Sequence, residues 1–395
     1  MKNQNTDSRP AGPKPWYDPQ VRSIFFQIVA ISLVFWAGWT LVDNTLTNME
    51  SRGISTGFGF LEESAGFGII MHLIPFDATM SYGRTFWVGL LNTLLVSAMG
   101  IVAATIIGFI IGVARLSSNW LVAKLALTYI EVIRNIPLLL QIFFWYFAVL
   151  RNLPSPRQGI EVGDWLFLNN RGLYTPEPFA QDGFGLVYGA LVAAIIGTVI
   201  LGRWARKRQT ETGDIFPMFR VGLGLIVGLP VITYLLAGQP LQWEFPELKG
   251  FNFSGGFVII PELAALWLAL SLYTASFIAE IVRSGILSVS KGQTEAAKAL
   301  GLPAKFTLRL VVIPQAMRVI IPPLTSQYLN LVKNSSLATA IGYPDLVAVF
   351  MGTTLNQTGQ AVEVVAITMA VYLTISLLIS LFMNIYNRAA AIKER

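Results

Sequence analysis

The chain has 395 residues, of which 54% are hydrophobic and only 13% are charged, and its mean hydropathy is +0.60. A soluble domain carries about 25% charged residues, so this composition indicates that much of the surface faces lipid. The absence of Cys excludes disulfides and thiolate sites. A single histidine, His72, disfavours His-pair metal sites and Ser-His-Asp triads. We therefore expect no catalytic residue, metal or other cofactor bound by this chain.

Membrane-spanning helices are predicted where Asp, Glu, Lys and Arg are absent over about 20 residues, the length that crosses the hydrocarbon core. Five windows reach that length, and three shorter ones are equally apolar with charges at their ends. For each short window, a buried core helix or a re-entrant segment is the alternative. In chain order the eight expected spans are 23–42, 85–114, 135–150, 183–202, 221–243, 263–279, 319–332 and 364–387.

The distribution of basic residues sets the orientation of these spans, because Lys and Arg accumulate in cytoplasmic loops. With a cytoplasmic N-terminus, the cytoplasmic tails and loops hold 21 of the 28 Lys and Arg residues. We therefore expect an all-α polytopic membrane protein with about eight transmembrane helices and both termini in the cytoplasm. The basic pI reflects this orientation, and nucleic-acid binding is the weaker interpretation.

The first window, 23–42, could also belong to a signal peptide. Its apolar run is longer than the usual 7–15 residues of such peptides, and no small-x-small cleavage site closes it. We interpret it as a retained anchor. Short interfacial helices are expected in the long outer loops 43–84 and 151–182.

The spans divide the chain into five parts. A cytoplasmic tail comes first, an extra helix with its outer loop follows, and a two-span block interrupts the remaining core. The second part of the core contains a cytoplasmic loop, 281–314. The five parts are 1–22, 23–84, 85–150, 151–260 and 261–395.

The loop 281–314 contains a short predicted helix that begins at an N-capping Thr294 and ends at Gly301, whose missing Cβ suits a left-handed C-cap. Pro303 prevents continuation of the helix. A helix of about two turns is unstable alone in water. Its small Ala-rich face, formed by Ala296, Ala297 and Ala299 with Leu300, would let another backbone approach closely. Docking on a partner and packing on its own chain are equally compatible with these residues.

The same segment resembles the EAA motif of ATP-binding-cassette importer permeases. Glu295, Ala296 and Ala297 are followed by Gly301, and an apolar-x-apolar-Pro ending closes the pattern at 311–314. The stretches 129–141, 277–286 and 331–338 further resemble motifs of the polar amino-acid subfamily, the histidine, glutamate and glutamine type. The similarity covers about 85–150 and 263–390. The added first span and the block 151–260 resemble the long permeases of general L-amino-acid or glutamate/glutamine/aspartate/asparagine uptake systems.

This resemblance implies a type I importer transmembrane fold in the bacterial inner membrane. It implies import of polar L-amino acids, acidic and amide ones included, with ATP and Mg bound by a separate dimer of ATPase subunits. It also implies a second, homologous permease and a periplasmic amino-acid-binding protein as partners, besides the lipid bilayer. The chain itself has no G-x-x-x-x-G-K-[ST] loop. The implied ATPase-coupling residues are Thr294, Glu295, Ala296, Ala297, Leu300 and Gly301.

Polar residues around interrupted helices are the candidates for substrate contact, because broken helix ends supply such groups near the middle of the membrane. The window 319–332 contains two prolines and leads into an ammonium, an amide and two hydroxyls, which could hold a carboxylate and a polar side chain. The alternative is that Lys333 extends to the interface and the small polar residues pack between helices. The candidates are Lys333, Asn334, Ser335, Ser336, Gln141, Asn92 and Thr93.

Arg134, Glu280 and Arg283 lie at cytoplasmic span ends and could form the ion pairs of a gate, or simply anchor the helices. The main alternative function is an ion-coupled secondary transporter. That class usually buries ionisable relay residues within its spans, whereas the long windows here are free of charge. An intramembrane enzyme and a non-transporting scaffold are further alternatives.

Overall fold

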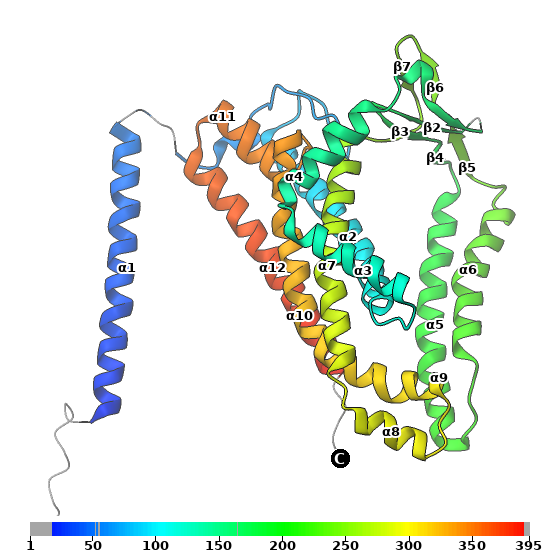
Figure 1. Cartoon of the computed structure of the whole chain (residues 1–395). Coiled ribbons are helices and arrows are strands. Elements are labelled where there is room, and N and C mark those ends of the chain that lie inside the picture. Colours follow the sequence, from blue (N-terminus) through cyan, green and yellow to red (C-terminus); the bar gives the residue numbers. More distant parts are fainter. Residues whose placement is uncertain (1–17, 52, 54–55, 164, 391–395) are drawn as a thin grey trace, which may run out of the picture. The chain divides into compact units, whose positions relative to one another are not determined.

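The computed structural model describes residues 18–51, 53, 56–163 and 165–390, so most of the expected tail, 1–22, lies outside it. Within these residues six helices are long and apolar enough to cross a membrane, or seven if one bent pair counts as a span. The helical polytopic fold is thus confirmed (Figure 1). The six helices are α1 (Pro19–Ser51), α2 (Tyr82–Ala114), α5 (Phe184–Thr212), α6 (Met218–Leu236), α7 (Pro261–Leu287) and α12 (Ala361–Ala390).

The expected span 135–150 begins at a sharp bend, and the helix before the bend was expected as part of a cytoplasmic loop. Helix α3 (Trp120–Asn135) meets α4 (Leu138–Phe143) at an angle of 105°, and π-helical and 3-10 turns continue α4 to Asn152. Pro137 explains the break, because proline pushes the preceding residue out of the helical region. Ile136 accordingly has extended backbone angles, φ −95° and ψ 127°.

The eighth expected span, 319–332, corresponds to α10 (Ile313–Asn334), which has the length of a span but is not among the apolar candidates. Arg318, Lys333 and several amide and hydroxyl side chains reduce its hydropathy. The prediction of about eight spans therefore becomes six or seven by length and composition.

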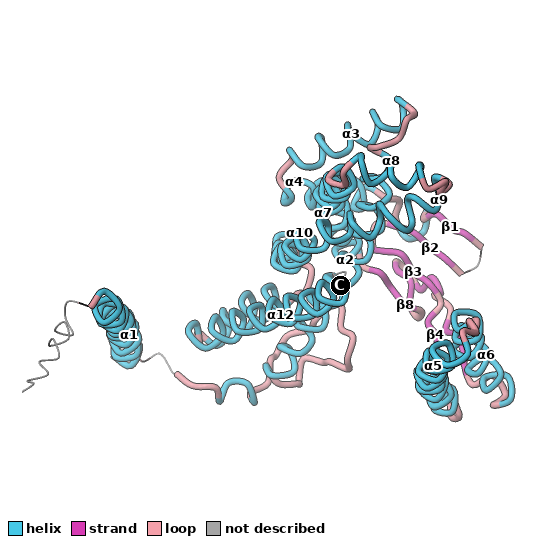
Figure 2. The backbone as a smooth tube through the Cα atoms, turned by 90° about the horizontal axis from the view of Figure 1, so that it is seen from below, coloured by secondary structure: helices cyan, strands magenta, loops and turns pink. Residues whose placement is uncertain are grey.

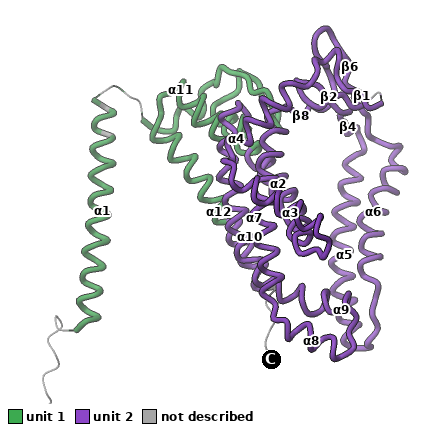
Figure 3. The backbone as a smooth tube through the Cα atoms, viewed as in Figure 1, with its two compact units in different colours: residues 1–92, 344–377 green, residues 93–343, 378–395 purple. Residues whose placement is uncertain are grey.

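The chain divides into two compact units (Figure 3). The first comprises residues 1–92 and 344–377. In its core, Phe60 from the outer loop packs with Tyr82 of α2, with Phe350 of the π-helical turn 347–354, and with Val364 of α12. The outer loop contributes one 3-10 turn, Gly59–Glu62, and α11 (Leu355–Thr358) precedes α12.

The second unit comprises residues 93–343 and 378–395 and is built around α7. Small residues let its helices approach closely. A Cβ added to Gly108 of α2 would lie 2.6 Å from Ile278 Cβ of α7, and one added to Gly112 would lie 2.7 Å from the Ala279 carbonyl oxygen. Gly285 of α7 similarly makes room for Ile320 of α10. Replacing these glycines would push the helices apart.

Outside its two expected spans, the block 151–260 forms short strands, where loops, with short interfacial helices in 151–182, were expected. One antiparallel sheet has the order β1-β2-β3-β8, and two hairpins, β4–β5 and β6–β7, accompany it. Strands β3 and β8 join the two ends of the block, with Leu173 opposite Ile259. The strands are β1 (Ile160–Val162), β2 (Leu166–Asn169), β3 (Gly172–Thr175), β4 (Glu177–Ala180), β5 (Leu241–Glu244), β6 (Glu247–Lys249), β7 (Asn252–Ser254) and β8 (Phe257–Ile259).

Helices α5 and α6 run side by side as a hairpin (Figure 2). Only 6% of the most apolar window of each helix is buried within the chain. Exposed side chains such as Val192 and Ile196 of α5 and Val227 of α6 cover the outside of the hairpin. A hairpin that is apolar all around suits burial in lipid.

Strand β8 leads directly into α7, and a short turn after α7 leads to α8 (Lys291–Ala299) and α9 (Ala304–Thr307). Figure 1 shows the strands at one end of this unit and α8 and α9 at the other. The outer block and the loop 281–314 are therefore separated by the length of α7, as their expected positions on opposite sides of the membrane require.

Candidate functional site

Helix α8 begins four residues earlier than expected, at Lys291, with Ser290 as its N-cap residue. The predicted N-cap role of Thr294 is therefore wrong. Its side chain lies within the helix and donates a hydrogen bond from Oγ1 to the Lys291 carbonyl oxygen at 2.7 Å. The sequence pattern favoured Thr294 because threonine is a good capping residue, but the helix begins after Ser290, whose side chain makes no capping hydrogen bond.

The end of α8 is where the sequence places it. Gly301 has a φ of +75°, in the left-handed region that favours glycine. Its amide donates to the Lys298 carbonyl oxygen at 2.9 Å, and the Leu302 amide donates to the Ala297 carbonyl oxygen at 3.0 Å. These two bonds form a Schellman motif, which satisfies carbonyls at the end of the helix.

One face of α8 packs on its own chain, and the rest is exposed. Ala297 is only 3% exposed, so its expected place on a docking surface is wrong. Helix α8 contacts α9 and the π-helical turn 308–312, and the Gln315 side chain donates to Gln293 Oε1 at 3.3 Å. The side chains that stay exposed include Glu295, Ala296, Ala299 and Leu300, the last at 81%.

The three predicted gate residues meet beside one cavity. Arg283 forms a forked pair with Glu280 on α7: Nη2 lies 2.6 Å from Oε1, and Nε lies 3.0 Å from Oε2. Ser284 Oγ lies 3.4 Å from Glu280 Oε1. The Arg134 guanidinium of α3 lies 5.0 Å from the centroid of the Phe277 ring of α7.

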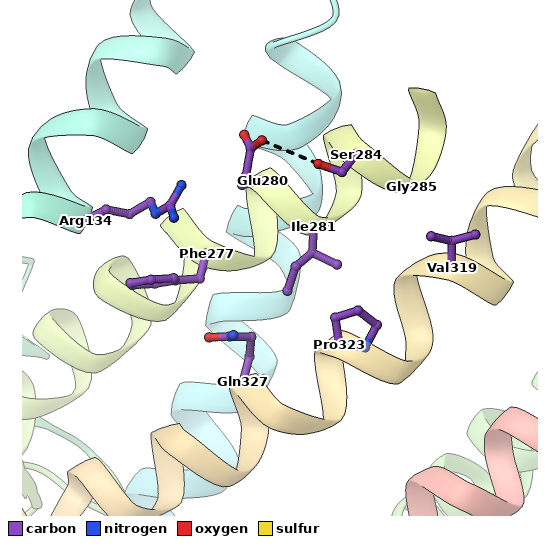
Figure 4. Close-up of a pocket in the computed structure, with 9 residues that line it drawn as sticks. All are labelled: Arg134, Phe277, Glu280, Ile281, Ser284, Gly285, Val319, Pro323 and Gln327. Atoms are coloured by element: carbon purple, nitrogen blue, oxygen red, sulfur yellow. Dashed lines mark hydrogen bonds between the residues drawn. The ribbon is translucent and has the colours of Figure 1, made fainter. Parts of the chain in front are cut away.

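The cavity next to this cluster has a volume of about 320 Å³ and lies among α3, α7 and α10 (Figure 4). Its α10 wall is a stripe with helical spacing, Val319, Pro323 and Gln327, which sequence reasoning missed. The i, i+4 spacing of the stripe was visible in the sequence, but nothing there identified α7 as the opposite wall. The lining residues are Arg134, Phe277, Glu280, Ile281, Ser284, Gly285, Val319, Pro323 and Gln327.

The sequence model of the inner-membrane component of binding-protein-dependent transport systems matches residues 100–392, which include both α8 and this cavity. The chain belongs to this family. It is thus a permease, a multi-pass transport component of the inner membrane. The expected family is confirmed.

Similar proteins match the permease over nearly its whole length. It is 60% identical, over 96% of both chains, to YhdX of Escherichia coli strain K12, which is named as an amino-acid ABC transporter permease protein. It is 52% identical, over 100% of both chains, to the general L-amino acid transport system permease protein AapQ of Rhizobium johnstonii. It is 42% identical, over 96% of both chains, to the glutamate/glutamine/aspartate/asparagine transport system permease protein BztB of Rhodobacter capsulatus. Such coverage includes the block 151–260.

The hydroxyls in the patch 333–336 of the permease bond to their own backbone. Ser335 is buried and donates to the Val332 carbonyl oxygen at 2.7 Å, and Ser336 donates to the Lys333 carbonyl oxygen at 2.7 Å. Lys333 is exposed and Asn334 is half-buried. These two side chains therefore have more freedom to contact a substrate than the two serines have.

Gln141 is buried at the break between α3 and α4. Its Nε2 donates to the carbonyl oxygens of Ile133 and Ile136, both at 2.9 Å. This bridge holds the bend on its inner side, so the side chain has a structural role in the permease. The carbonyl before a helix break lacks its usual intrahelical donor, which explains why an amide is needed there.

Asn92 is buried in the first unit, where its Nδ2 donates to the carbonyl oxygens of Met71 and Pro344, both at 2.9 Å. Thr93 is also buried but belongs to the second unit. The expected substrate residues thus lie in separate local environments. None of them lines the cavity beside Glu280.

Among the described residues, no group of three or more His, Cys, Asp and Glu side chains could hold a metal ion. Asp345 is a buried acid that sequence reasoning missed. Its Oδ1 accepts a hydrogen bond from the Ala348 amide at 2.8 Å and caps the helical turns that follow. An Asp directly before a helix is a recognisable capping signal.

Proposed function

We propose that this permease forms the translocation path of an importer that moves polar L-amino acids, including acidic and amide ones, into the cytoplasm. Its similarity to AapQ and BztB over nearly the whole chain carries this proposal, because their names specify amino-acid uptake systems. The energy source is ATP, hydrolysed with Mg²⁺ by a dimer of separate ATPase subunits. A second, homologous permease and a periplasmic amino-acid-binding protein complete the assembly.

Helix α8 is the proposed contact with the ATPase. Its exposed residues Ala296, Ala299 and Leu300 offer a small apolar surface on which another backbone can approach closely. Glu295 is exposed beside them, whereas Ala297 is buried on the face of α8 that packs on its own chain. The Schellman motif at Gly301 fixes the direction in which the helix ends.

Arg134, Glu280 and Arg283 are proposed as part of a cytoplasmic gate. Their helices, α3 and α7, also contact each other. A relative tilt of these two helices would move Arg134 relative to the forked Glu280–Arg283 pair. The cavity beside the pair would then change in volume during transport. Static anchoring of the helix ends is the alternative outcome.

Lys333 and Asn334 are the proposed substrate contacts among the candidates. Lys333 is exposed and Asn334 is half-buried, whereas the hydroxyls of Ser335 and Ser336 bond to backbone carbonyls. An ammonium and an amide can hold a substrate carboxylate and a polar side chain. The other candidates then support the path by fixing the surrounding backbone. They are Ser335, Ser336, Gln141, Asn92 and Thr93.

Co-purification of the permease with the proteins encoded beside it, followed by reconstitution in proteoliposomes, tests the proposed function. We expect ATPase activity that rises when the binding protein and glutamate, glutamine, aspartate or asparagine are added together. Uptake should require ATP and persist in the presence of uncouplers. Uptake that stops with an uncoupler and proceeds without ATP would show a secondary transporter and overturn the proposal.

A further inference from the structure

Helix α5 has one face against α6 and an opposite face that meets lipid. Ala194 and Ala205 are buried, and Thr198 packs on α6, where a Cβ added to Gly222 would lie 3.0 Å from Thr198 Cγ2. The opposite face is apolar and more than half exposed, in a helix long enough to cross the membrane. Its residues, spaced four and then three positions apart, are Val192, Ile196 and Val199.

This lipid-facing stripe becomes basic at its end. Arg203 and Arg206 continue the same alternation of four and three positions, so they share the face of Val199, and both are exposed. The charge-free window ends at Gly202, which places Arg203 about 2 Å and Arg206 about 6 Å further along the helix axis. Lipid headgroups occupy roughly 5–7 Å on each side of the hydrocarbon core. The two guanidinium groups therefore lie at the depth of the headgroups.

The turn between α5 and α6 lies at the same end of this unit as α8 and α9 (Figure 1). This is the end expected on the cytoplasmic side, where the loop 203–220 contributes five of the basic residues that set the orientation. The headgroups in question are thus those of the cytoplasmic leaflet, whose anionic lipids attract basic residues next to membrane spans.

Ion pairing separates these two arginines from the cations that follow them. Lys207 Nζ lies 3.8 Å from Glu211 Oε1, and Arg208 Nη2 lies 3.3 Å from Asp214 Oδ2. In contrast, neither Arg203 nor Arg206 forms an ion pair with any residue that the structure describes. The cations further from the membrane are neutralised within the chain, whereas the two at headgroup depth are left for an anion from outside.

We propose that Arg203 and Arg206 bind the phosphate group of an anionic phospholipid in the cytoplasmic leaflet. The planar guanidinium fork matches a phosphate, and each such bond is assisted by charge. An acidic surface of the ATPase is the other possible occupant. It is disfavoured because the same helix face is apolar one turn earlier, at Val199, where lipid covers it. This lipid site goes beyond the proposed transport function and does not depend on it.

Photolabelling of the intact transport complex tests the site. The complex is placed in phosphatidylcholine nanodiscs with a trace of either phosphatidylglycerol or phosphatidylcholine that carries a diazirine at the top of its acyl chain. Chymotryptic peptides are quantified by mass spectrometry, since this protease does not depend on arginine. Over 199–210 we expect phosphatidylglycerol to label roughly 25-fold more than phosphatidylcholine, or fivefold for each of two basic residues. Around Val192, deeper in the membrane, the two lipids should label equally.

Substitution of the arginines tests their role directly. Arg203→Gln and Arg206→Gln should each lower the preference about fivefold, and the double variant should label equally with both lipids. Lys207, Arg208 and Arg220 remain in the loop, so the orientation of the hairpin is kept. Equal thermal unfolding midpoints of variants and parent exclude misfolding as the cause of a loss.

Two further variants serve as controls. Arg203→Lys combined with Arg206→Lys keeps both charges and should retain most of the preference. Arg171→Gln removes an exposed arginine between β2 and β3, at the other end of the unit, and should change nothing.

Three results would overturn the lipid site. The first is equal labelling of 199–210 by the two lipids in the parent complex. The second is a preference that survives the double glutamine variant. The third is labelling that appears only after the ATPase subunits are removed, which would assign this face to the ATPase. Failure to hydrolyse ATP or to transport amino acids would instead concern the proposed function, because lipid labelling requires neither activity.

Discussion

Arg283 holds the carboxylate of Glu280 in a forked pair one turn along α7, with Nη2 2.6 Å from Oε1. The side chains of Arg283 and Glu280 are 30% and 32% exposed. Glu280 lines the cavity among α3, α7 and α10, and Arg283 lies next to this lining residue. A partly exposed pair within one helix contributes little to stability, roughly 0–1 kcal/mol. The pair therefore contributes little to the free energy of unfolding, and its proposed role is in the gate.

Arg283→Lys keeps the charge but removes the planar fork that binds both carboxylate oxygens. If the pair belongs to the gate, we expect a several-fold rise of ATPase activity without binding protein, together with weaker stimulation by it. The unfolding midpoint should change by only a few degrees. Parent-like basal and stimulated ATPase rates would assign the pair to static anchoring. Lys249→Arg, in an exposed ion pair on β6, is the control.

Gly301→Val should uncouple the permease from the ATPase. The substitution meets no atom within 4 Å of its Cβ, but the φ of +75° is strained for a β-branched residue. We expect the Schellman motif to open, so that uptake and stimulated ATPase activity are lost while the amount of permease in the membrane stays near that of the parent.

Gly292→Ala is the matched control for this prediction. Gly292 lies within α8 and has no positive φ, and an added Cβ would only approach Ser290 Oγ at 3.6 Å. Because alanine is the better helix former, this variant should couple as well as the parent. Uptake retained by Gly301→Val, measured alongside it, would contradict the proposed role of α8.

Leu300→Ser tests the exposed surface of α8 directly. The side chain is 81% exposed in the permease alone, so its replacement should leave the fold intact. A truncated interface residue of this kind weakens binding by about 1 kcal/mol, or roughly fivefold. Dissociation of the ATPase from detergent-solubilised complexes measures the effect, and Leu248→Ser on β6 serves as an exposed-leucine control.

Ala297→Asp should act differently from Leu300→Ser, since it places a charge where the side chain is 3% exposed. An unpaired buried charge displaces α8 from α9. We expect loss of coupling accompanied by increased protease cleavage within 288–303, whereas Leu300→Ser should leave cleavage unchanged. Equal protease resistance of the two variants would mean that Ala297 does not position the helix.

The sequence predicted the long helices well because a charge-free window directly reflects the thickness of the membrane. It also predicted the end of α8, where Gly301 and Pro303 both terminate a helix. The strands were missed for a physical reason. Each has only three or four residues, and β3 pairs with β8 across more than 80 residues of chain, so no local pattern marks them.

The candidate site was predicted only in part, because a polar residue does not reveal which partner it uses. Glu280 and Arg283 were recoverable, since i, i+3 spacing places them together on a helix. The hydroxyls of Ser335 and Ser336 turned out to bond to backbone carbonyls one turn earlier. The α10 wall of the cavity beside Glu280, formed by Val319, Pro323 and Gln327, lies opposite α7, and this pairing could be found only in three dimensions.

Gln141→Leu should destabilise the bend between α3 and α4. Leucine has a similar volume but leaves the carbonyl oxygens of Ile133 and Ile136 without the Nε2 donor that each has now at 2.9 Å. Losing bonds to these part-buried carbonyls costs about 1 kcal/mol each. We expect an unfolding midpoint lower by several degrees and less protein in the membrane, while binding-protein-stimulated ATPase per complex is retained. Gln141→Glu keeps the size but replaces the donor by an acceptor, and should be at least as destabilising. If both variants instead unfold like the parent and lose uptake, Gln141 contacts the substrate and does not merely support the bend.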